Sequence, residues 1–141
     1  MMGIFNIKLA IAILCFCLYG CSSTSVAPNI AKAVKSAPNF SFQQGRVALT
    51  IVRDNGLVSG GCSITVLIDG DDVAQLGTGE KTTAYVNPGN ITVGAGFMGR
   101  GFCNGGSVKE RDFVIEQNKP KNLRIFIDQS GNIDILPTTL K

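Results

Sequence analysis

Residues that could carry chemistry are sparse in this chain of 141 residues. It contains no histidine, the commonest general base and transition-metal ligand, so Ser-His and Cys-His catalytic pairs are excluded. An acid pair of the glycosidase type would need two neighbouring carboxyl groups. The acidic residues that could supply one, Glu80, Glu110, Asp112 and Glu116, are scattered over strand-like segments, where side chains of this kind usually face solvent. We therefore expect no catalytic residue and no enzymatic activity.

The stretch GAGFMG at positions 94–99 matches G-x-G-x-x-G, the spacing with which a backbone wraps a pyrophosphate. In a dinucleotide-binding fold those glycines open a helix whose N-terminus holds the phosphates. Here RGFCNGG follows, and its glycines disfavour a helix. We interpret the stretch as a strand end and a glycine-rich loop, and we expect no cofactor.

The same loop is the best candidate for binding, because aromatic, Met and Arg side chains are enriched at interfaces. Its candidate residues are Phe97, Met98, Arg100 and Phe102. The alternative is that both phenylalanines simply pack into the core beside Cys103. A separate acidic stretch, DGDD at 69–72, lacks the alternating acids and distant Glu of a calcium loop. It predicts a polar turn, and no metal site is expected.

Five cysteines are present, and their positions divide them into separate groups. Cys15 and Cys17 fall within an apolar N-terminal run, and Cys21 ends it. Cys62 and Cys103 remain as an even pair, which without histidine makes a poor metal site. We predict a disulfide between them, which would stabilise the fold by about 4 kcal/mol in the chain-entropy model.

The N-terminus has the pattern of an export signal. Lys8 precedes an apolar run from Leu9 to Leu18, which is the order of charged and hydrophobic regions in a secretory signal. The run is short for a membrane span, which needs about twenty apolar residues. An ordinary signal peptide with a coincidental cysteine is one interpretation of this segment.

The end of that run is more specific. Leu18, Tyr19, Gly20 and Cys21 resemble the lipobox of bacterial lipoproteins. The resemblance implies cleavage before Cys21, acylation of that cysteine, and attachment to a membrane through its acyl chains. Ser22, in place of Asp, implies sorting to the outer membrane. The protein would face the periplasm there, with the cell surface as the alternative.

Three regions follow from this interpretation: a signal peptide at 1–20, the lipidated cysteine and a flexible tether at 21–44, and a folded domain at 45–141. The tether is rich in Ser, Ala, Pro and Asn. Its stretch NIAKAVKSA could form a helical turn or two, which Pro38 would end. Of the 13 basic residues one is Lys8, so 12 face 10 acidic ones after cleavage. This near balance gives no indication of nucleic-acid binding.

From residue 46 onward apolar residues recur at every second position, as in half-buried strands. The clearest runs contain Val47, Leu49 and Ile51; Ile64, Val66 and Ile68; and Leu123, Ile125 and Ile127. Further strands are expected at 72–76, 82–86, 91–97, 108–116 and 132–136. The pattern predicts an all-β fold: a small antiparallel β-sandwich or open barrel of about seven or eight strands.

Turn residues separate these runs. Asp69-Gly70 is a two-residue hairpin signal, Pro88-Gly89 fits the centre of a type II turn, and Gly131 provides positive φ for a last hairpin. The segment 66–96, with Asp69-Gly70, Leu76-Gly77 and Pro88-Gly89, resembles PEGA-type domains and related short bacterial lipoproteins. The resemblance implies a β-sandwich surface domain that acts in binding or scaffolding.

These observations lead to two functional expectations. The first is a lipid-anchored envelope lipoprotein that acts as a non-catalytic interaction or scaffolding module, with an envelope protein as its partner. The second is a ligand-binding or inhibitor lipoprotein that recognises a glycan, an incoming enzyme or a phage.

Overall fold

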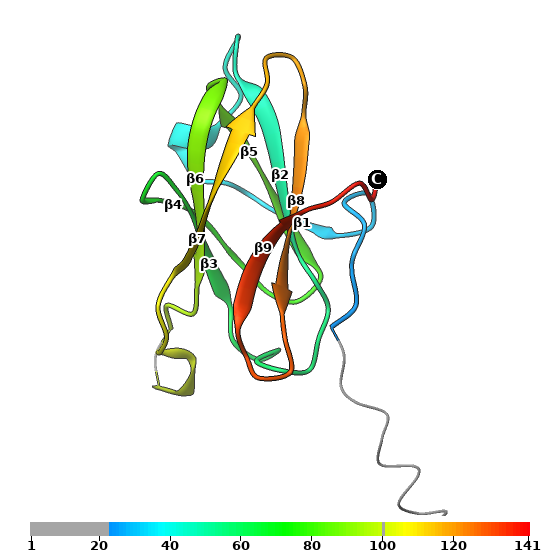
Figure 1. Ribbon diagram of the computed structural model, residues 1–141, viewed down its shortest axis with the longest axis vertical. Coiled ribbons are helices and arrows are strands. Elements are labelled where there is room, and N and C mark those ends of the chain that lie inside the picture. The colour runs from blue at the N-terminus through cyan, green and yellow to red at the C-terminus, as the bar shows by residue number, and fades with distance from the viewer. Residues whose placement is uncertain (1–22, 100) are drawn as a thin grey trace, which may run out of the picture.

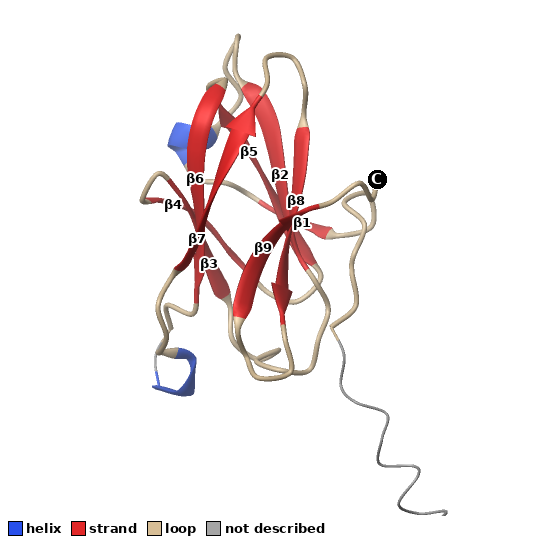
Figure 2. Ribbon diagram, viewed as in Figure 1, coloured by secondary structure: helices blue, strands red, loops and turns tan. Residues whose placement is uncertain are grey.

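The computed structural model describes residues 23–99 and 101–141. The expected signal peptide, the lipobox, Cys21 and Arg100 lie outside these residues. Within them, nine strands and two short 3-10 turns make up the regular structure (Figures 1 and 2). The strands are β1 (Lys32–Val34), β2 (Val47–Arg53), β3 (Ile64–Ile68), β4 (Asp71–Leu76), β5 (Glu80–Val86), β6 (Gly89–Gly96), β7 (Lys109–Ile115), β8 (Lys121–Ile127) and β9 (Ile133–Pro137). The 3-10 turns are η1 (Pro38–Phe40) and η2 (Gly101–Cys103).

The strands form a sandwich of two sheets, and the predicted all-β fold is confirmed. One sheet has the order β1-β5-β2-β8-β9 and the other the order β4-β3-β6-β7. Five of the seven strand pairs among the described residues are antiparallel, and two are parallel, β1 with β5 and β2 with β8. The chain changes sheet at the β2–β3, β4–β5, β5–β6 and β7–β8 connections, so strands distant in sequence become neighbours. A period of two indicates which face is buried, but not which strand lies alongside.

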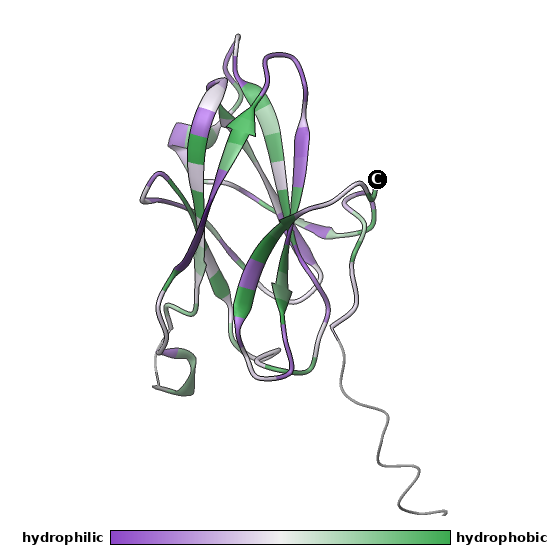
Figure 3. Cartoon of the chain, viewed as in Figure 1, coloured by the Kyte–Doolittle hydropathy of each residue, from purple (hydrophilic) through white to green (hydrophobic). Residues whose placement is uncertain are grey.

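The core lies between the sheets and is built by the alternating apolar residues. Leu49, Ile51, Ile64, Val66 and Ile125 are fully buried. Figure 3 shows the same alternation as hydrophobic and hydrophilic bands along the strands. Aliphatic β-branched residues fill this space, as is usual where two pleated faces interdigitate.

Two of the three predicted turns form as hairpins, whereas the type II turn expected at Pro88-Gly89 is wrong, because Pro88 is only a bend and Gly89 already begins β6. Asp69 and Gly70 have φ values of 51° and 87° between β3 and β4, as a type I′ hairpin requires. Gly131 has a φ of 84° in the β8–β9 hairpin. There the Asp128 carboxylate accepts hydrogen bonds from the backbone amides of Ser130 and Asn132. Gly89 also has positive φ, where the chain passes from one sheet to the other.

The expected flexible tether is not observed in the described part of the chain, because residues 23–44 belong to the folded domain. Val26 and Ala31 are buried against Val52 on the outer face of β2. Further along, Phe40 is buried in the main core. The helical turns expected at 29–37 are also wrong. This segment contains β1, the one strand that the sequence did not predict, which pairs with β5 from Lys32 to Val34. The apolar residues of the segment find a partner surface, and this tertiary pairing overrides the high helix propensity of its Ala and Lys residues.

Candidate functional site

The predicted disulfide is present and joins two loops at one end of the sandwich. Cys62 and Cys103 are bonded, with their Cα atoms 5.3 Å apart. The bond connects the loop between β2 and β3 to the loop between β6 and β7. We call the described residues of 55–63 and 97–108 the stapled end; both loops lie at the lower end in Figure 1.

Arg53 organises the first of these loops from inside the fold. Its side chain is fully buried, and its guanidinium donates hydrogen bonds to the carbonyl oxygens of Ser59 at 2.9 Å, Cys62 at 2.5 Å and Leu76 at 2.9 Å. Burial lowers the pKa of Arg53, and nearby Glu80 opposes this effect. The side chain is therefore a structural anchor for the loop. Sequence reasoning missed it, although the period of two that places Ile51 in the core places Arg53 on the same face.

A second buried charge fastens the N-terminal segment to the sandwich. Asp54 accepts hydrogen bonds from Arg124 Nε at 2.9 Å and Nη2 at 2.5 Å, and from the Val26 amide at 3.4 Å. Burial raises the pKa of Asp54 despite the opposing effect of Arg124. Its carboxylate is occupied by three structural donors, so this pair serves architecture rather than proton transfer.

The predicted interaction loop is partly packed into the core and partly exposed, so each of the two alternatives, core packing and an exposed binding surface, holds for some of its residues. Phe97 is half-buried and packs against the core. In contrast, Met98 is 54% exposed and Phe102 is fully exposed. Arg100 is outside the described residues. Sequence reasoning missed Leu57, which is 81% exposed in the other stapled loop; its signal was a lone large apolar residue in a run of small and polar ones.

The glycines of GAGFMG have a packing role. Gly94 and Gly96 lie within β6, which pairs with β3 and β7. A Cβ atom on either would lie 3.1 Å from a methyl group of Val108, so a larger residue would push this side chain away. These glycines sit inside an antiparallel sheet and do not open a helix, which removes the geometry of a pyrophosphate cradle.

The opposite end of the sandwich contains a hollow of about 380 Å³, which we call the far-end hollow. Arg46 crosses it and donates to the Asn39 carbonyl oxygen at 2.6 Å. Phe42 is 71% exposed beside it and packs edge-on against Tyr85, with ring centroids 5.3 Å apart. The remaining lining is largely amide, carboxylate and apolar: Phe40, Ile68, Asp69, Asp71, Val86, Asn87, Pro88, Asn90 and Ile91.

A cleft of about 560 Å³ runs between the sheet edges at β7 and β9. Arg111 crosses from β7 to Asp134 on β9, with Nε and Nη2 donating at 2.6 and 2.9 Å. The hydrogen bond from Arg111 lowers the pKa of Asp134, and the same contact raises the pKa of Arg111. Lys121 Nζ lies 5.9 Å from the centroid of the Phe113 ring in the cleft wall. The Arg111–Asp134 pair therefore ties the two edges together.

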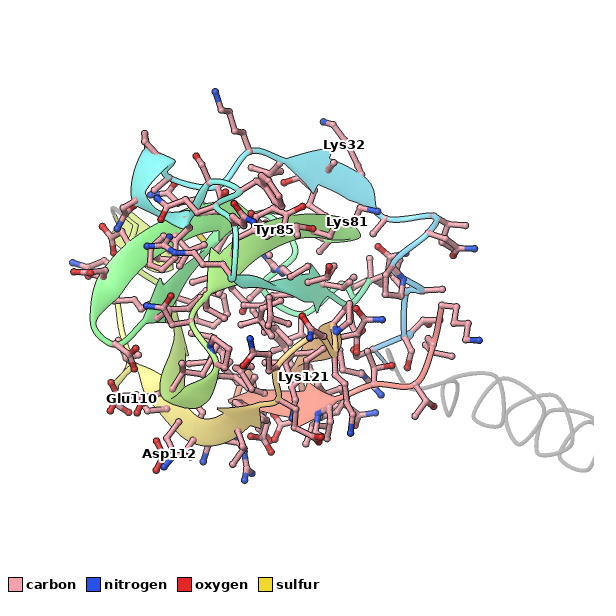
Figure 4. The ribbon with its side chains drawn as sticks, turned by 90° about the horizontal axis from the view of Figure 1, so that it is seen from above. Lys32, Lys81, Tyr85, Glu110, Asp112 and Lys121 are labelled. Atoms are coloured by element: carbon pink, nitrogen blue, oxygen red, sulfur yellow. A yellow bond between two sulfur atoms is a disulfide. The ribbon has the colours of Figure 1, made fainter. Side chains whose placement is uncertain are left out.

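The four carboxylates considered for an acid pair do not gather at one site, although Glu110 and Asp112 both line the cleft at β7 beside Arg111. Glu110 and Asp112 lie on β7, on the side of the sandwich opposite Lys32, Lys81 and Tyr85 (Figure 4). Of the other two, Glu80 lies on β5 in the other sheet, where it accepts from the Gly77 amide and pairs with Lys32, and Glu116 pairs with Lys119.

The acidic stretch at 69–72 forms the predicted polar turn. Asp69 accepts a hydrogen bond at 2.8 Å from the Thr92 amide, which links the β3–β4 turn to β6. Among the described residues, no three or more His, Cys, Asp or Glu side chains are grouped so that they could hold a metal ion.

Comparison with known proteins does not place the chain in a family. In the described part of the chain, no helix combines the length and apolar character needed to cross a membrane. No protein-family model matches the sequence, and neither curated proteins nor solved structures give a match.

Proposed function

We propose that this protein is a bacterial envelope lipoprotein, held in the outer membrane by acyl chains on Cys21, that acts as a non-catalytic interaction module. The lipobox-like residues 18–21 support the anchor. The Cys62–Cys103 disulfide supports an oxidising compartment such as the periplasm. The resemblance of residues 66–96 to PEGA-type domains is consistent with a binding or scaffolding role.

The state of the reactive groups favours binding over catalysis. Both described cysteines are bonded to each other, which removes them as nucleophiles. The buried Arg53 and Asp54 and the half-buried Arg124 are held by structural hydrogen bonds. What the domain offers to other molecules is therefore its surface.

The observation that carries the proposal is the difference between the two ends of the sandwich. The chain enters the domain at the stapled end, where Thr24 pairs with Asn55. An acylated Cys21 would hold that end near the membrane and direct the far-end hollow toward the compartment. Phe42, Arg46 and Tyr85 around this hollow belong to the residue types enriched at protein interfaces. We assign the envelope partner to this hollow.

Site-specific photo-crosslinking in intact cells tests this assignment. A photoactivatable phenylalanine analogue at position 42 should give one defined adduct with an envelope protein, and Asn90→Arg in the hollow should abolish it. The same analogue at position 102 is the matched control and should give no protein adduct. Adducts at position 102 alone would place the partner at the stapled end instead.

A ligand-binding function is the second candidate, and the lining of the far-end hollow favours it. Asn87, Asn90 and Asp71 surround the wall formed by Tyr85, and amides, carboxylates and an aromatic ring are suitable groups for binding a sugar. In the same experiment, recovery of glycan fragments on position 42 without a protein adduct would support this function.

The anchor has a separate test. Cys21→Ser should leave the protein unacylated and move it from the membrane fraction to the soluble periplasmic fraction. Unchanged fractionation of the variant would reject lipid attachment at this residue.

A further inference from the structure

The N-terminal segment meets the domain at the stapled end. The backbone amide of Thr24 donates to the Asn55 carbonyl oxygen at 2.8 Å, and the Asn55 amide donates back to Thr24 at 3.0 Å. Ser23 lies against Gly56, since a Cβ atom on that glycine would be 3.7 Å from the Ser23 Cα atom. The chain therefore enters next to Leu57.

Cys21 is only two residues before Ser23. Two residues span at most about 7 Å when fully extended. Because residues 23–44 are packed into the domain, no tether separates the fold from an acyl group on Cys21. An anchor there keeps the stapled end at the lipid surface.

The stapled end has the composition of a surface that meets lipid. Leu57, Met98 and Phe102 are all largely exposed there, on the two loops that the Cys62–Cys103 bond joins. None of the residues that the structure describes in 55–63 and 97–108 is charged. The acidic turn at 69–72 follows β3, whose other end adjoins Cys62, so these carboxylates lie away from this end.

The stapled end is also held in place before any contact forms. The Cys62–Cys103 bond joins its two loops, and Arg53 fixes the carbonyl groups of Ser59 and Cys62. Preorganised loops lose little conformational entropy when they bind. The covalent anchor raises the effective concentration of lipid at this end, so that even a weak insertion becomes populated.

We propose that the stapled end docks on the bilayer and that Leu57, Met98 and Phe102 insert at the boundary between headgroups and acyl chains. The inference rests on the acylation of Cys21 in the proposed function, and it assigns Met98 and Phe102 of the predicted interaction loop to lipid rather than to a protein partner. Side chains of these types enter the interface in membrane-surface proteins.

The absence of tryptophan from the sequence allows a direct test with a single indole. Phe102→Trp places the probe at the stapled end. Phe42→Trp is the matched control, since Phe42 is an exposed phenylalanine beside the far-end hollow. Both full-length, acylated proteins are reconstituted into phosphatidylcholine–phosphatidylglycerol vesicles with and without brominated acyl chains. Melting curves of the two variants verify that each remains folded.

The indole at position 102 should show blue-shifted emission, at least twofold quenching by the brominated lipid, and severalfold weaker quenching by iodide than the indole at position 42. Equal iodide quenching of the two probes, with no effect of brominated lipid on the Phe102→Trp variant, would overturn the proposal. A blue shift of that variant which brominated lipid does not quench would show a second copy on this end, and would also overturn it.

The mass of the N-terminal peptide separates this inference from the proposed function. If Cys21 carries no acyl chain, the anchor fails, and the same chain is mixed with the same vesicles. Bromine quenching of the indole at position 102 would then still support lipid docking by this end, and its absence would overturn it.

Discussion

At the residue scale, the informative side chains are charged ones that the core encloses. The Arg53 guanidinium donates hydrogen bonds to the carbonyl oxygens of Ser59, Cys62 and Leu76. Its place on the inner face follows from the alternation of β2, but a period of two alone would not predict a buried guanidinium. The partners that make burial tolerable are loop carbonyl groups, and their positions depend on the folded loop itself. The residues of the Asp54–Arg124 pair are 70 apart in sequence, so that pair was equally hidden from the sequence.

Arg53→Met should destabilise the domain strongly. The substitution keeps the apolar stem but leaves one buried and two part-buried carbonyl groups without a charged donor, and losing one partner of such a network costs about 3 kcal/mol. Urea unfolding measures this loss. Lys35→Met, at an exposed position, removes a positive charge without buried partners and should stay within about 0.5 kcal/mol of the wild type. Equal stability of the two variants would mean that Arg53 does not organise the loop.

The Arg111–Asp134 pair should make stability depend on acid pH. Its hydrogen bond holds the pKa of Asp134 below the ordinary value of 3.8, so the unfolded chain takes up a proton first as the pH falls. The contribution of the pair is present above that ordinary value and is lost as the pH falls through the folded-state pKa. Asp134→Asn should lower Tm by about 2 °C at pH 7, because the pair lies at the surface.

This difference in Tm between Asp134→Asn and the wild type should shrink as the pH falls below the ordinary pKa of 3.8 and disappear once the carboxyl group is protonated in both the folded and the unfolded chain. Asp72→Asn is the control. This substitution removes the same charge at an exposed residue that forms no ion pair among the described residues. It should show no comparable pH-dependent difference. A gap for Asp134→Asn that persists unchanged into acid would contradict the role assigned to the pair.

At the scale of elements, the sequence predicts strands better than it predicts their partners. Eight of the nine strands follow from alternation and turn residues, and the two hairpins at 69–70 and 128–132 confirm the turn chemistry. The sequence could not predict β1, because its three residues are marked only by the parallel partner β5. The same limit applies to β2 and β8, whose parallel pairing joins residues that lie more than 60 positions apart.

The candidate site divides in the same way. The disulfide was predictable, because an even pair of cysteines in a chain without histidine makes a poor metal site and, in the exported protein that we propose, has few other uses. The exposure of Phe102 and the burial of Phe97 were not, because neighbouring loop residues differ only in how the folded loop presents them. The exposure of Leu57 was equally hidden, and so was the contact between Ser23 and Gly56, because these two residues lie far apart in the sequence.

The Cys62–Cys103 bond links residues 41 positions apart, and its removal should cost about 4 kcal/mol in the chain-entropy model. The double variant Cys62→Ser, Cys103→Ser should therefore melt many degrees below the wild type. A reducing agent provides the control: it should lower the Tm of the wild type and leave that of the double variant unchanged. Insensitivity of the wild type to reduction, together with two free thiols in the purified protein, would contradict the bond.

At the scale of the whole molecule, the two ends of the sandwich have different properties. The entry point of the chain and the exposed Leu57, Met98 and Phe102 share one end. Arg46, Asp69 and Tyr85 line the hollow at the other. Lys32 and Lys81 lie on one side of the sandwich and Glu110 and Asp112 on the opposite one (Figure 4), but each side also carries the other sign of charge, Glu80 beside Lys32 and Arg111 between the two acids. With the proposed anchor, the domain would present fixed surfaces to the membrane and to the compartment, provided that the anchor is short.

The length of the chain between Cys21 and the folded domain can therefore be varied to test how the domain is oriented relative to the membrane. A flexible Gly/Ser segment of about 20 residues, inserted between Ser22 and Ser23 of the Phe102→Trp variant, spans about 25 Å on average. It should leave acylation and membrane fractionation unchanged, yet reduce the quenching of the indole by brominated lipid, because the effective concentration of the bilayer at the stapled end falls. If brominated lipid still quenches the indole fully after the insertion, the loops of the stapled end bind the bilayer without a short anchor. The orientation of the domain would then depend on these loops alone. The same segment can be inserted into the protein that carries the photoactivatable analogue at position 42. If the indole at position 102 becomes accessible to iodide while the adducts from position 42 persist, the domain binds its partner independently of the membrane. The short connection would then set only which face the partner meets.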